Sequence, residues 1–118
     1  MQSNKPNIVI EKSAEFSLKI IECVELLESK KKFVIANQLL KSGTSIGANV
    51  YEAQNAESKP DFIHKMKIAA KEADETNYWL LLCQRSKSYP NCESLQIQLE
   101  EIAKILSKII STSKGAVI

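Results

Sequence analysis

Three glutamates could take part in metal chemistry if the fold placed them on facing helices. Glu52, Glu72 and Glu75 carry the carboxylates that bridge paired iron ions inside helical bundles. Such sites also need Glu-x-x-His on two helices, and this chain has one histidine, His64, and no Glu-x-x-His. His64 is expected on the solvated side of its helix. We therefore expect no catalytic residue, metal or cofactor, with a carboxylate metal-binding bundle enzyme as the alternative.

Cysteine chemistry has little support in the sequence. Cys23, Cys83 and Cys92 are odd in number and far apart along the chain, and no C-x-x-C occurs. This spacing argues against a disulfide framework and against a zinc site. Cys23 and Cys83 lie on helical patterns, where a free cysteine behaves as a small buried hydrophobic residue.

Lysines are the candidate phosphate contacts. The net charge is only +2, so bulk charge does not indicate nucleic-acid binding. Phosphate contacts depend on the number and placement of cations more than on a sequence pattern. The candidates are Lys30, Lys31, Lys32, Lys41, Lys59, Lys65, Lys67 and Lys71. The alternative is that these lysines are simply solvated.

The stretch 33–62 is the unusual part of the chain, because its helical period includes two glycines. Its apolar face is expected to hold Phe33, Ala36, Leu39, Leu40, Gly43, Ile46, Gly47, Val50 and Ala53. Gly43 and Gly47 each cost about 1 kcal/mol relative to alanine inside a helix. Tight packing against a neighbouring helix would offset that cost, and approach of the backbone to a ligand is the alternative.

A polar stripe runs along the opposite face of the same helix. Lys41, Ser45, Asn49 and Glu52 recur at helical spacing. Serine and asparagine are weak helix formers, so their presence in mid-helix suggests hydrogen bonds to a neighbouring helix or subunit. The alternative is a solvated face.

The periodicity predicts four helices, at residues 8–31, 32–54, 59–87 and 92–112. Ser58 and Asp61 are spaced as a capping box, and Pro60 fits the first turn of a helix. The third helix carries a second apolar patch, opposite its core face, formed by Ile68, Trp79, Leu82 and Cys83 with Glu72 and Glu75 between them. A tryptophan on an outer face is expected to anchor another chain, although burial under a loop is the alternative.

These elements predict one all-α domain over residues 1–118, an antiparallel up-down-up-down four-helix bundle. Residues 1–7 and 113–118 are expected to fray. The excess apolar surface on the first and third helices predicts an oligomer. No signal peptide and no membrane-spanning run is apparent, so we expect a cytoplasmic protein without membrane contact.

Two spaced motifs carry a family resemblance over residues 8–110. The first, S-I-x-A-N-[IV]-x-E, is matched by Ser45, Ile46, Ala48, Asn49, Val50 and Glu52. The second, K-E-A-x-E-T-x-Y-W-L, is matched by Lys71, Glu72, Ala73, Glu75, Thr76, Tyr78, Trp79 and Leu80. The chain thus resembles the four-helix-bundle family of the 23S rRNA-intervening sequence protein. Many relatives carry arginine at the positions of Lys41 and Tyr51, so a role that needs a guanidinium is not expected here.

The resemblance implies a homopentameric ring and no enzymatic activity. In one related branch, the accessory proteins of diversity-generating retroelements, a pentameric barrel associates with a reverse transcriptase and nucleic acid. We expect a non-enzymatic oligomeric module that contacts nucleic acid or a nucleic-acid-processing partner. The alternative is a regulatory scaffold that binds only protein.

Overall fold

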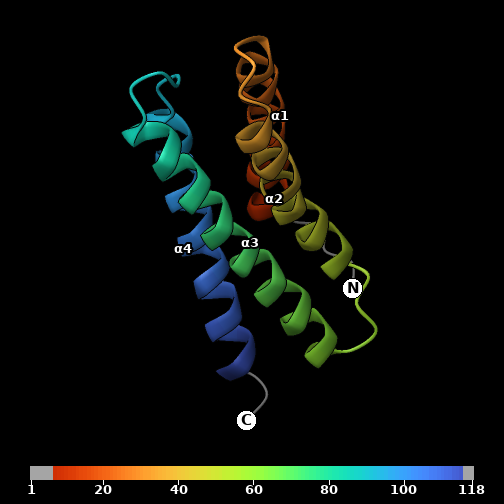
Figure 1. Ribbon diagram of the computed structural model, residues 1–118. Helices are drawn as coiled ribbons and strands as arrows, with labels where there is room; N and C mark the ends of the chain where they lie inside the picture. Colours follow the sequence, from red (N-terminus) through yellow and green to blue (C-terminus); the bar gives the residue numbers. More distant parts are fainter. Residues whose placement is uncertain (1–6, 116–118) are drawn as a thin grey trace.

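Four α-helices and no strand make up the part of the chain that the structure, a computed structural model, describes: residues 7–115. They are α1 (Ile8–Ser29), α2 (Phe33–Ala53), α3 (Lys59–Arg85) and α4 (Glu93–Gly115) (Figure 1). The prediction of an all-α chain of four helices is confirmed. α4 continues past its predicted end at Thr112, so residues 113–115, expected to fray, are helical. Residues 1–6 and 116–118, which were also expected to fray, lie outside the described residues.

Side-chain caps explain where three of the helices begin. Asn7 Oδ1 accepts a hydrogen bond from the backbone N–H of Ile10, at 3.4 Å, before α1. Ser58 Oγ accepts from the N–H of Asp61 at 3.2 Å, and the Asp61 carboxylate accepts from the N–H of Glu57 at 3.1 Å. Ahead of α4, the side chain of Asn91 accepts from the N–H of Glu93 at 2.8 Å. The bonds from Ile10, Asp61 and Glu93 satisfy donors that the first helical turn leaves unpaired, and the bond from Glu57 holds the residue just before the Ser58 cap.

A short turn of three lysines joins α1 to α2. Lys31 has a φ of 62°, the left-handed conformation that commonly ends a helix. The N–H of Lys32 bonds the carbonyl of Leu27 and the N–H of Lys31 bonds that of Glu28, both at 2.9 Å. This pair of bonds satisfies the last carbonyls of α1 and reverses the chain within residues 30–32. Lys32 then lies over the ring of Tyr89, 5.0 Å from its centroid.

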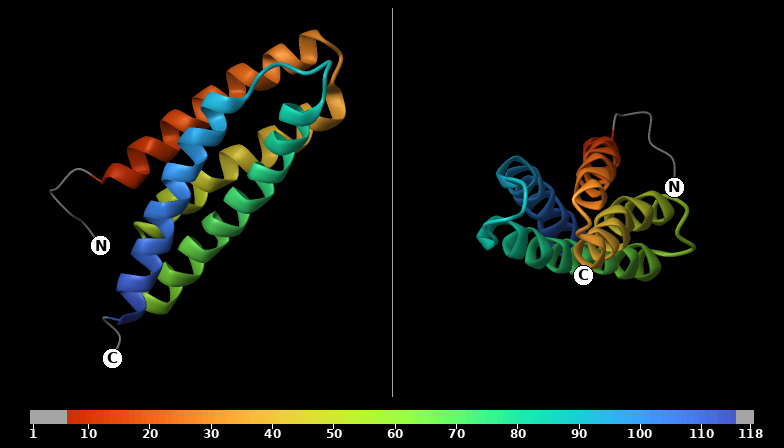
Figure 2. Two further views of the ribbon diagram at one scale, coloured as in Figure 1. Left: turned by 90° about the vertical axis from the view of Figure 1, so that its left-hand side faces the viewer. Right: turned by 45° about the horizontal axis from the view of Figure 1, so that its top comes forward.

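Each helix packs against two others. α1 lies beside α2, α2 beside α3, α3 beside α4, and α4 beside α1, whereas α1–α3 and α2–α4 do not approach closely within the described residues. The connections 30–32 and 86–92 lie at one end, and 54–58 lies at the other (Figures 1 and 2). The result is a rod of 50 × 21 × 21 Å.

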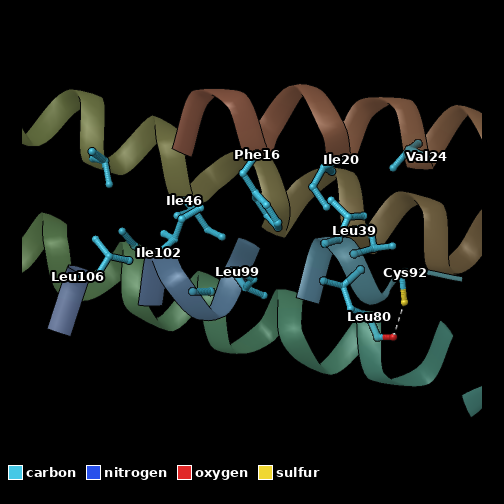
Figure 3. Close-up of a cluster of buried hydrophobic side chains, with 14 of the residues drawn as sticks. Phe16, Ile20, Val24, Leu39, Ile46, Leu80, Cys92, Leu99, Ile102 and Leu106 are labelled. Atoms are coloured by element: carbon cyan, nitrogen blue, oxygen red, sulfur yellow. Dashed lines mark hydrogen bonds between the residues drawn. The ribbon is translucent and has the colours of Figure 1, made fainter. Parts of the chain in front are cut away.

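The core runs along the axis of this rod, where side chains from all four helices meet (Figure 3). The largest fully buried side chains are Phe16, Ile20, Leu27, Leu39, Ile46, Met66, Leu80, Ile102 and Leu106. Burying one such side chain contributes about 1.5–3 kcal/mol. This continuous core holds the outer faces of the helices in fixed positions.

Several predicted core positions are wrong in detail. Phe33 and Leu40, assigned to the apolar face of α2, are 58% and 37% exposed. On α1, the helical period placed Ala14 and Ile21 in an apolar stripe, but both are exposed, while Val9 is buried. Cys83 is buried in the core, which confirms its description as a small buried residue and contradicts its place in an outer patch of α3. At the exposed positions the apolar pattern was wider than the face that the two neighbouring helices cover.

Three hydroxyl side chains occupy core positions that the apolar pattern left out: Ser13, Ser42 and Thr76. Thr76 Oγ1 lies 2.9 Å from Ser42 Oγ across the α2–α3 contact and 2.7 Å from the carbonyl oxygen of Glu72. Ser42 donates to the carbonyl of Gln38 at 3.0 Å. These bonds satisfy the hydroxyls, so their burial carries no unpaired polar atom.

Candidate interaction surface on helices α2 and α3

The predicted interface residues gather along the outer side of the α2–α3 contact. Ser42 and Thr76 mark the line along which these helices meet. Ser45 and Asn49 follow Ser42 at helical spacing, and Trp79 follows Thr76 in the same way. We call the set Ser45, Asn49, Glu52, Ile68, Glu72, Trp79 and Leu82 the α2–α3 face.

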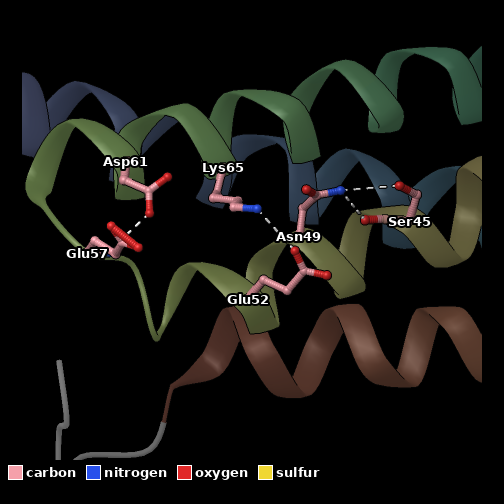
Figure 4. A network of polar contacts seen from close by, with 6 residues as sticks. All are labelled: Ser45, Asn49, Glu52, Glu57, Asp61 and Lys65. Carbon is pink, nitrogen blue, oxygen red and sulfur yellow. Dashed lines mark hydrogen bonds and ion pairs between the residues drawn. The ribbon is translucent and has the colours of Figure 1, made fainter.

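The polar part of this face is organised by bonds within the chain (Figure 4). Asn49 Nδ2 donates to the carbonyl of Ser45 at 2.9 Å and to Ser45 Oγ at 3.2 Å. Glu52 pairs with Lys65 of α3 at 3.2 Å. Ser45 and Asn49 are half-buried beside α3, whereas Glu52 and Lys41 are exposed. No described residue donates to Asn49 Oδ1, which leaves that acceptor open to another molecule.

Trp79 forms the apolar centre of the face. Its ring is half-buried and packs on the core, and its Nε1 donates to Glu75 Oε2 at 3.1 Å. The ring of Tyr78 meets it edge-on, with centroids 5.2 Å apart. Leu82, one turn along, is 36% exposed, and Ile68 is half-buried. An indole with a satisfied N–H and one uncovered side is suited to packing against a second chain.

Exposed large apolar side chains are unevenly distributed around the rod. Among the described residues, α4 contributes only Ile97. The other three helices carry Ile8, Leu18, Ile21, Leu26, Phe33, Val34, Leu40, Tyr51, Tyr78 and Leu82. Single exposed apolar residues are ordinary, but concentration on part of a surface marks an interaction region.

Gly43 and Gly47 lie where α1 approaches α2. A Cβ on Gly43 would come within 2.9 Å of both γ carbons of Ile20. A Cβ on Gly47 would lie 3.3 Å from the carbonyl oxygen of Ser13 and from Ser17 Oγ. Both glycines therefore face α1, on the side of α2 away from the polar stripe.

The lysine candidates do not form one surface. Lys65 pairs with Glu52, and Lys30, Lys31 and Lys32 lie at the end of the rod opposite the start of α3. Lys41, Lys59 and Lys71 are exposed on α2 or α3.

Lys67 is different, because Lys114 of α4 lies beside it. The hydrogen bond and the positive charge of Lys114, with a smaller effect of desolvation, lower the pKa of Lys67. The sequence interpretation missed Lys114 because it assigned residues 113–118 to a frayed end.

The carboxylates considered for metal chemistry do not converge. Glu52 is engaged by Lys65, and Glu75 by the indole of Trp79. Within residues 7–115, no three histidine, cysteine, aspartate or glutamate side chains are arranged to hold a metal ion. The exposed His64 lies apart from them, at a hollow between α3 and α4.

The three free cysteines are close enough to influence one another, which their sequence spacing did not reveal. Burial, followed by the charges of Cys92 and Cys23, raises the pKa of Cys83 to about 12. Burial first, and then Cys92, raises the pKa of Cys23. Cys92 Sγ donates to the carbonyl of Leu80 at 3.1 Å (Figure 3), and burial raises its pKa although its own backbone hydrogen bond opposes the shift. Thiols in this state are poor nucleophiles.

No helix in the described part of the chain has both the length and the apolar character needed to cross a membrane.

The outer surface of the rod has three different parts. They are a polar and aromatic face on α2–α3, an apolar surface on α1 and α2, and a charged and polar surface on α4.

Comparisons with known proteins agree with the fold. The structure is similar to the crystal structure, at 1.70 Å resolution, of a protein of unknown function from the S23 ribosomal protein family of Bacteroides thetaiotaomicron VPI-5482. The two chains are 46% identical with a TM-score of 0.82, over 86% of this chain and 97% of the other. No curated protein matches at a significant level. The family model described as 23S rRNA-intervening sequence protein matches residues 5–108. This chain therefore belongs to the 23S rRNA-intervening sequence protein family.

Proposed function

We propose that this protein is a non-enzymatic assembly module, a homopentameric ring of antiparallel up-down-up-down bundles that contacts nucleic acid or a nucleic-acid-processing partner. The alternating ends of the three connections support the antiparallel course. The single observation that carries the assembly is the placement of Trp79 on the α2–α3 face, with its N–H satisfied and one side uncovered. The proposal places the module in the cytoplasm, where its free thiols stay reduced.

A ring needs two different surfaces on each subunit, because head-to-tail contacts join unlike patches. The α2–α3 face offers one surface. The exposed apolar residues of α1 and α2, including Leu18 and Leu40, offer the other. The exposed residues of α4 are charged or polar apart from Ile97 and Gly115, which suits a surface that stays in water. Five copies would repeat each lysine around the ring, so that a nearly neutral chain could still concentrate positive charge.

The assembly is tested by comparing Trp79→Asp with Ile97→Asp. Both place a carboxylate at a surface apolar position, but Ile97 lies on α4, 65% exposed and outside both surfaces. Native mass spectrometry should give five times the chain mass of 13.2 kDa for the wild type and for Ile97→Asp. Trp79→Asp should give a smaller species with unchanged helical circular dichroism. A Trp79→Asp variant that keeps the wild-type mass and stability contradicts the interface.

The nucleic-acid contact is tested by fluorescence anisotropy with labelled single-stranded RNA, duplex RNA and duplex DNA at low and moderate salt. Binding that weakens steeply with salt is expected, because phosphate contacts release counterions. Absence of binding at low salt would leave a scaffold that binds only protein. The ring and the nucleic-acid contact are thus separable by experiment.

A further inference from the structure

Two neighbouring hollows lie between α3 and α4. The first, of about 360 Å³, is lined by Pro60, Ile63, His64, Lys67 and Lys114. The second, of about 450 Å³, is lined by Ala70, Asp74, Ala103, Ser107, Ile110, Ser111 and Lys114. Lys114 lines both hollows, so the two hollows adjoin at this residue.

The first hollow holds two cations without a counter-charge. Lys67 and Lys114 come from different helices, yet their side chains line the same hollow and lie close enough for Lys114 to lower the pKa of Lys67. The ion pairs among the described residues are Lys12–Glu101, Lys65–Glu52 and Lys104–Glu100, and none includes either lysine. Two ammonium groups repel at short range, and this repulsion adds to the effect of the Lys114 hydrogen bond in lowering the pKa of Lys67. An anion between them would allow both to stay charged.

We propose that Lys67 and Lys114, with His64 at the rim of the same hollow, bind a phosphate group of a nucleic-acid backbone. This inference rests on the proposed function, for which it names the contact site. Lysine binds phosphate as a compact point charge, and two lysines on separate helices can hold one phosphate from two directions. The hydroxyls of Ser107 and Ser111, in the second hollow, are donors of the kind that contact phosphate and sugar oxygens.

A backbone phosphate fits this place better than a free small molecule. A small-molecule site encloses most of its ligand, whereas His64, Lys67 and Lys114 are all exposed. An open hollow can accept one phosphate of a long chain that continues over the surface. Asp74 places a negative charge in the second hollow, which confines the phosphate to the Lys67–Lys114 end.

The site also lies apart from both proposed assembly surfaces. It is formed where α3 meets α4, and none of the residues that line it belongs to the α2–α3 face or to the exposed apolar residues of α1 and α2. A ring built through those two surfaces would leave this hollow open. Each subunit would then present the same lysine pair, so that several phosphates of one strand could be held at once.

The single histidine supplies a direct test. His64 is the only histidine in the chain, so its imidazole gives one unambiguous set of NMR signals. Titration with inorganic phosphate at constant ionic strength, using chloride as the control, should shift these signals. The shift should be lost in Lys67→Gln/Lys114→Gln and kept in Lys104→Gln/Lys108→Gln. The control pair removes the same charge from exposed positions of α4, and neither of its residues lines either hollow or is among the candidate phosphate contacts.

RNA binding by the same variants provides the second measurement. Lys67→Gln/Lys114→Gln should weaken binding of a labelled single-stranded RNA about fivefold at low salt, the size expected when two exposed charge contacts are lost. The slope of log affinity against log salt should fall by about 0.7 for each phosphate contact removed. The control pair should change affinity less than twofold. Unchanged mass and helicity would exclude misfolding as the cause.

The outcomes separate this site from the proposed function. If the wild type binds RNA but both lysine pairs behave alike, the site is wrong and the nucleic-acid contact stands. If phosphate shifts the His64 signals but no nucleic acid binds, the backbone assignment is overturned and the hollow is a free-phosphate site. If His64 does not respond to phosphate, or responds equally after removal of Lys67 and Lys114, the lysine pair is not a phosphate site.

Discussion

Replacing Gly43 with alanine tests whether close packing of α1 on α2 explains the glycines of α2. In an unobstructed helix interior this change stabilises by about 1 kcal/mol, because alanine restricts the unfolded chain and favours helix. In this structure the new Cβ would lie 2.9 Å from Cγ1 and Cγ2 of Ile20 and 3.1 Å from its Cδ1. Real Cβ atoms do not approach other atoms so closely, so Ile20 or α1 must move.

The expected balance is a loss of stability. Ile20 is fully buried, and a β-branched side chain in a helix has one strongly preferred rotamer. The colliding atoms are its γ carbons, which cannot move away without a change of rotamer or of backbone. Overpacking of this kind costs about 1–3 kcal/mol. After subtraction of the helix-propensity gain of about 1 kcal/mol, Gly43→Ala should lower the free energy of unfolding by up to about 2 kcal/mol.

Urea unfolding followed by circular dichroism, at one fixed protein concentration, measures this change. Two other glycines serve as controls. Gly47→Ala should be close to neutral, because its Cβ would meet Ser13 and Ser17 at 3.3 Å, a tight but tolerable contact. Gly115→Ala has no atom within 4 Å, so it should be neutral or slightly stabilising.

A second substitution identifies the clash. Ile20→Val removes Cδ1 but keeps both γ carbons, so it should not relieve Gly43→Ala. Ile20→Ala removes all three atoms, so Gly43→Ala should become neutral or stabilising in that background, with a coupling of about 1–3 kcal/mol. If Gly43→Ala alone stabilises the protein, or if valine relieves it as well as alanine does, close packing against Ile20 is not the reason for this glycine.

Three further predictions concern polar and titratable groups. Thr76→Val should lower the free energy of unfolding, measured in urea, by about 1 kcal/mol. The loss should be smaller in a Ser42→Ala background, where the partner hydroxyl is already absent, and strictly additive losses would show that the two hydroxyls are not coupled. The Cys83 thiol keeps its proton in the fold to a pKa of about 12 but loses it near pH 9 when unfolded. Stability should therefore be full below pH 9 and fall by about 1.4 kcal/mol per pH unit from there until the folded pKa of about 12 is reached, and a pH series with Cys83→Ala should show a shallower fall. Asn49→Leu should reduce the native mass if Oδ1 accepts a bond from a second subunit, whereas an unchanged mass would place the stripe in solvent.

The sequence predicted the helices well because their boundaries depend on local chemistry. Ser58, Pro60 and Asp61 act within one turn, and the structure has α3 begin at Lys59 as predicted. Which face is buried depends on neighbours and was predicted less well. A pattern that scored only apolar residues could not place Ser42 or Thr76 in the core, since their burial depends on hydrogen bonds.

Long-range proximity was the main omission. The Lys67–Lys114 pair and the three cysteines join segments far apart in sequence, and no periodicity reports such pairs. One signal was available: in a bundle with short connections, the start of the third helix and the end of the fourth lie at the same end. That argument would have placed Lys114 near Lys67 if residues 113–118 had been treated as helical.

The circular order of helix contacts has a consequence for how the bundle folds and opens. Three of the four contacts join helices linked by short turns, so each closes a small loop at low entropic cost. The contact between α1 and α4 must instead bring together opposite ends of the chain, and an exposed ion pair, Lys12–Glu101 at 3.1 Å, spans it. Folding can therefore proceed by successive local hairpins, with this pairing as its last step. In the folded state the same seam can part while every hairpin stays intact, which makes it the natural line of partial unfolding.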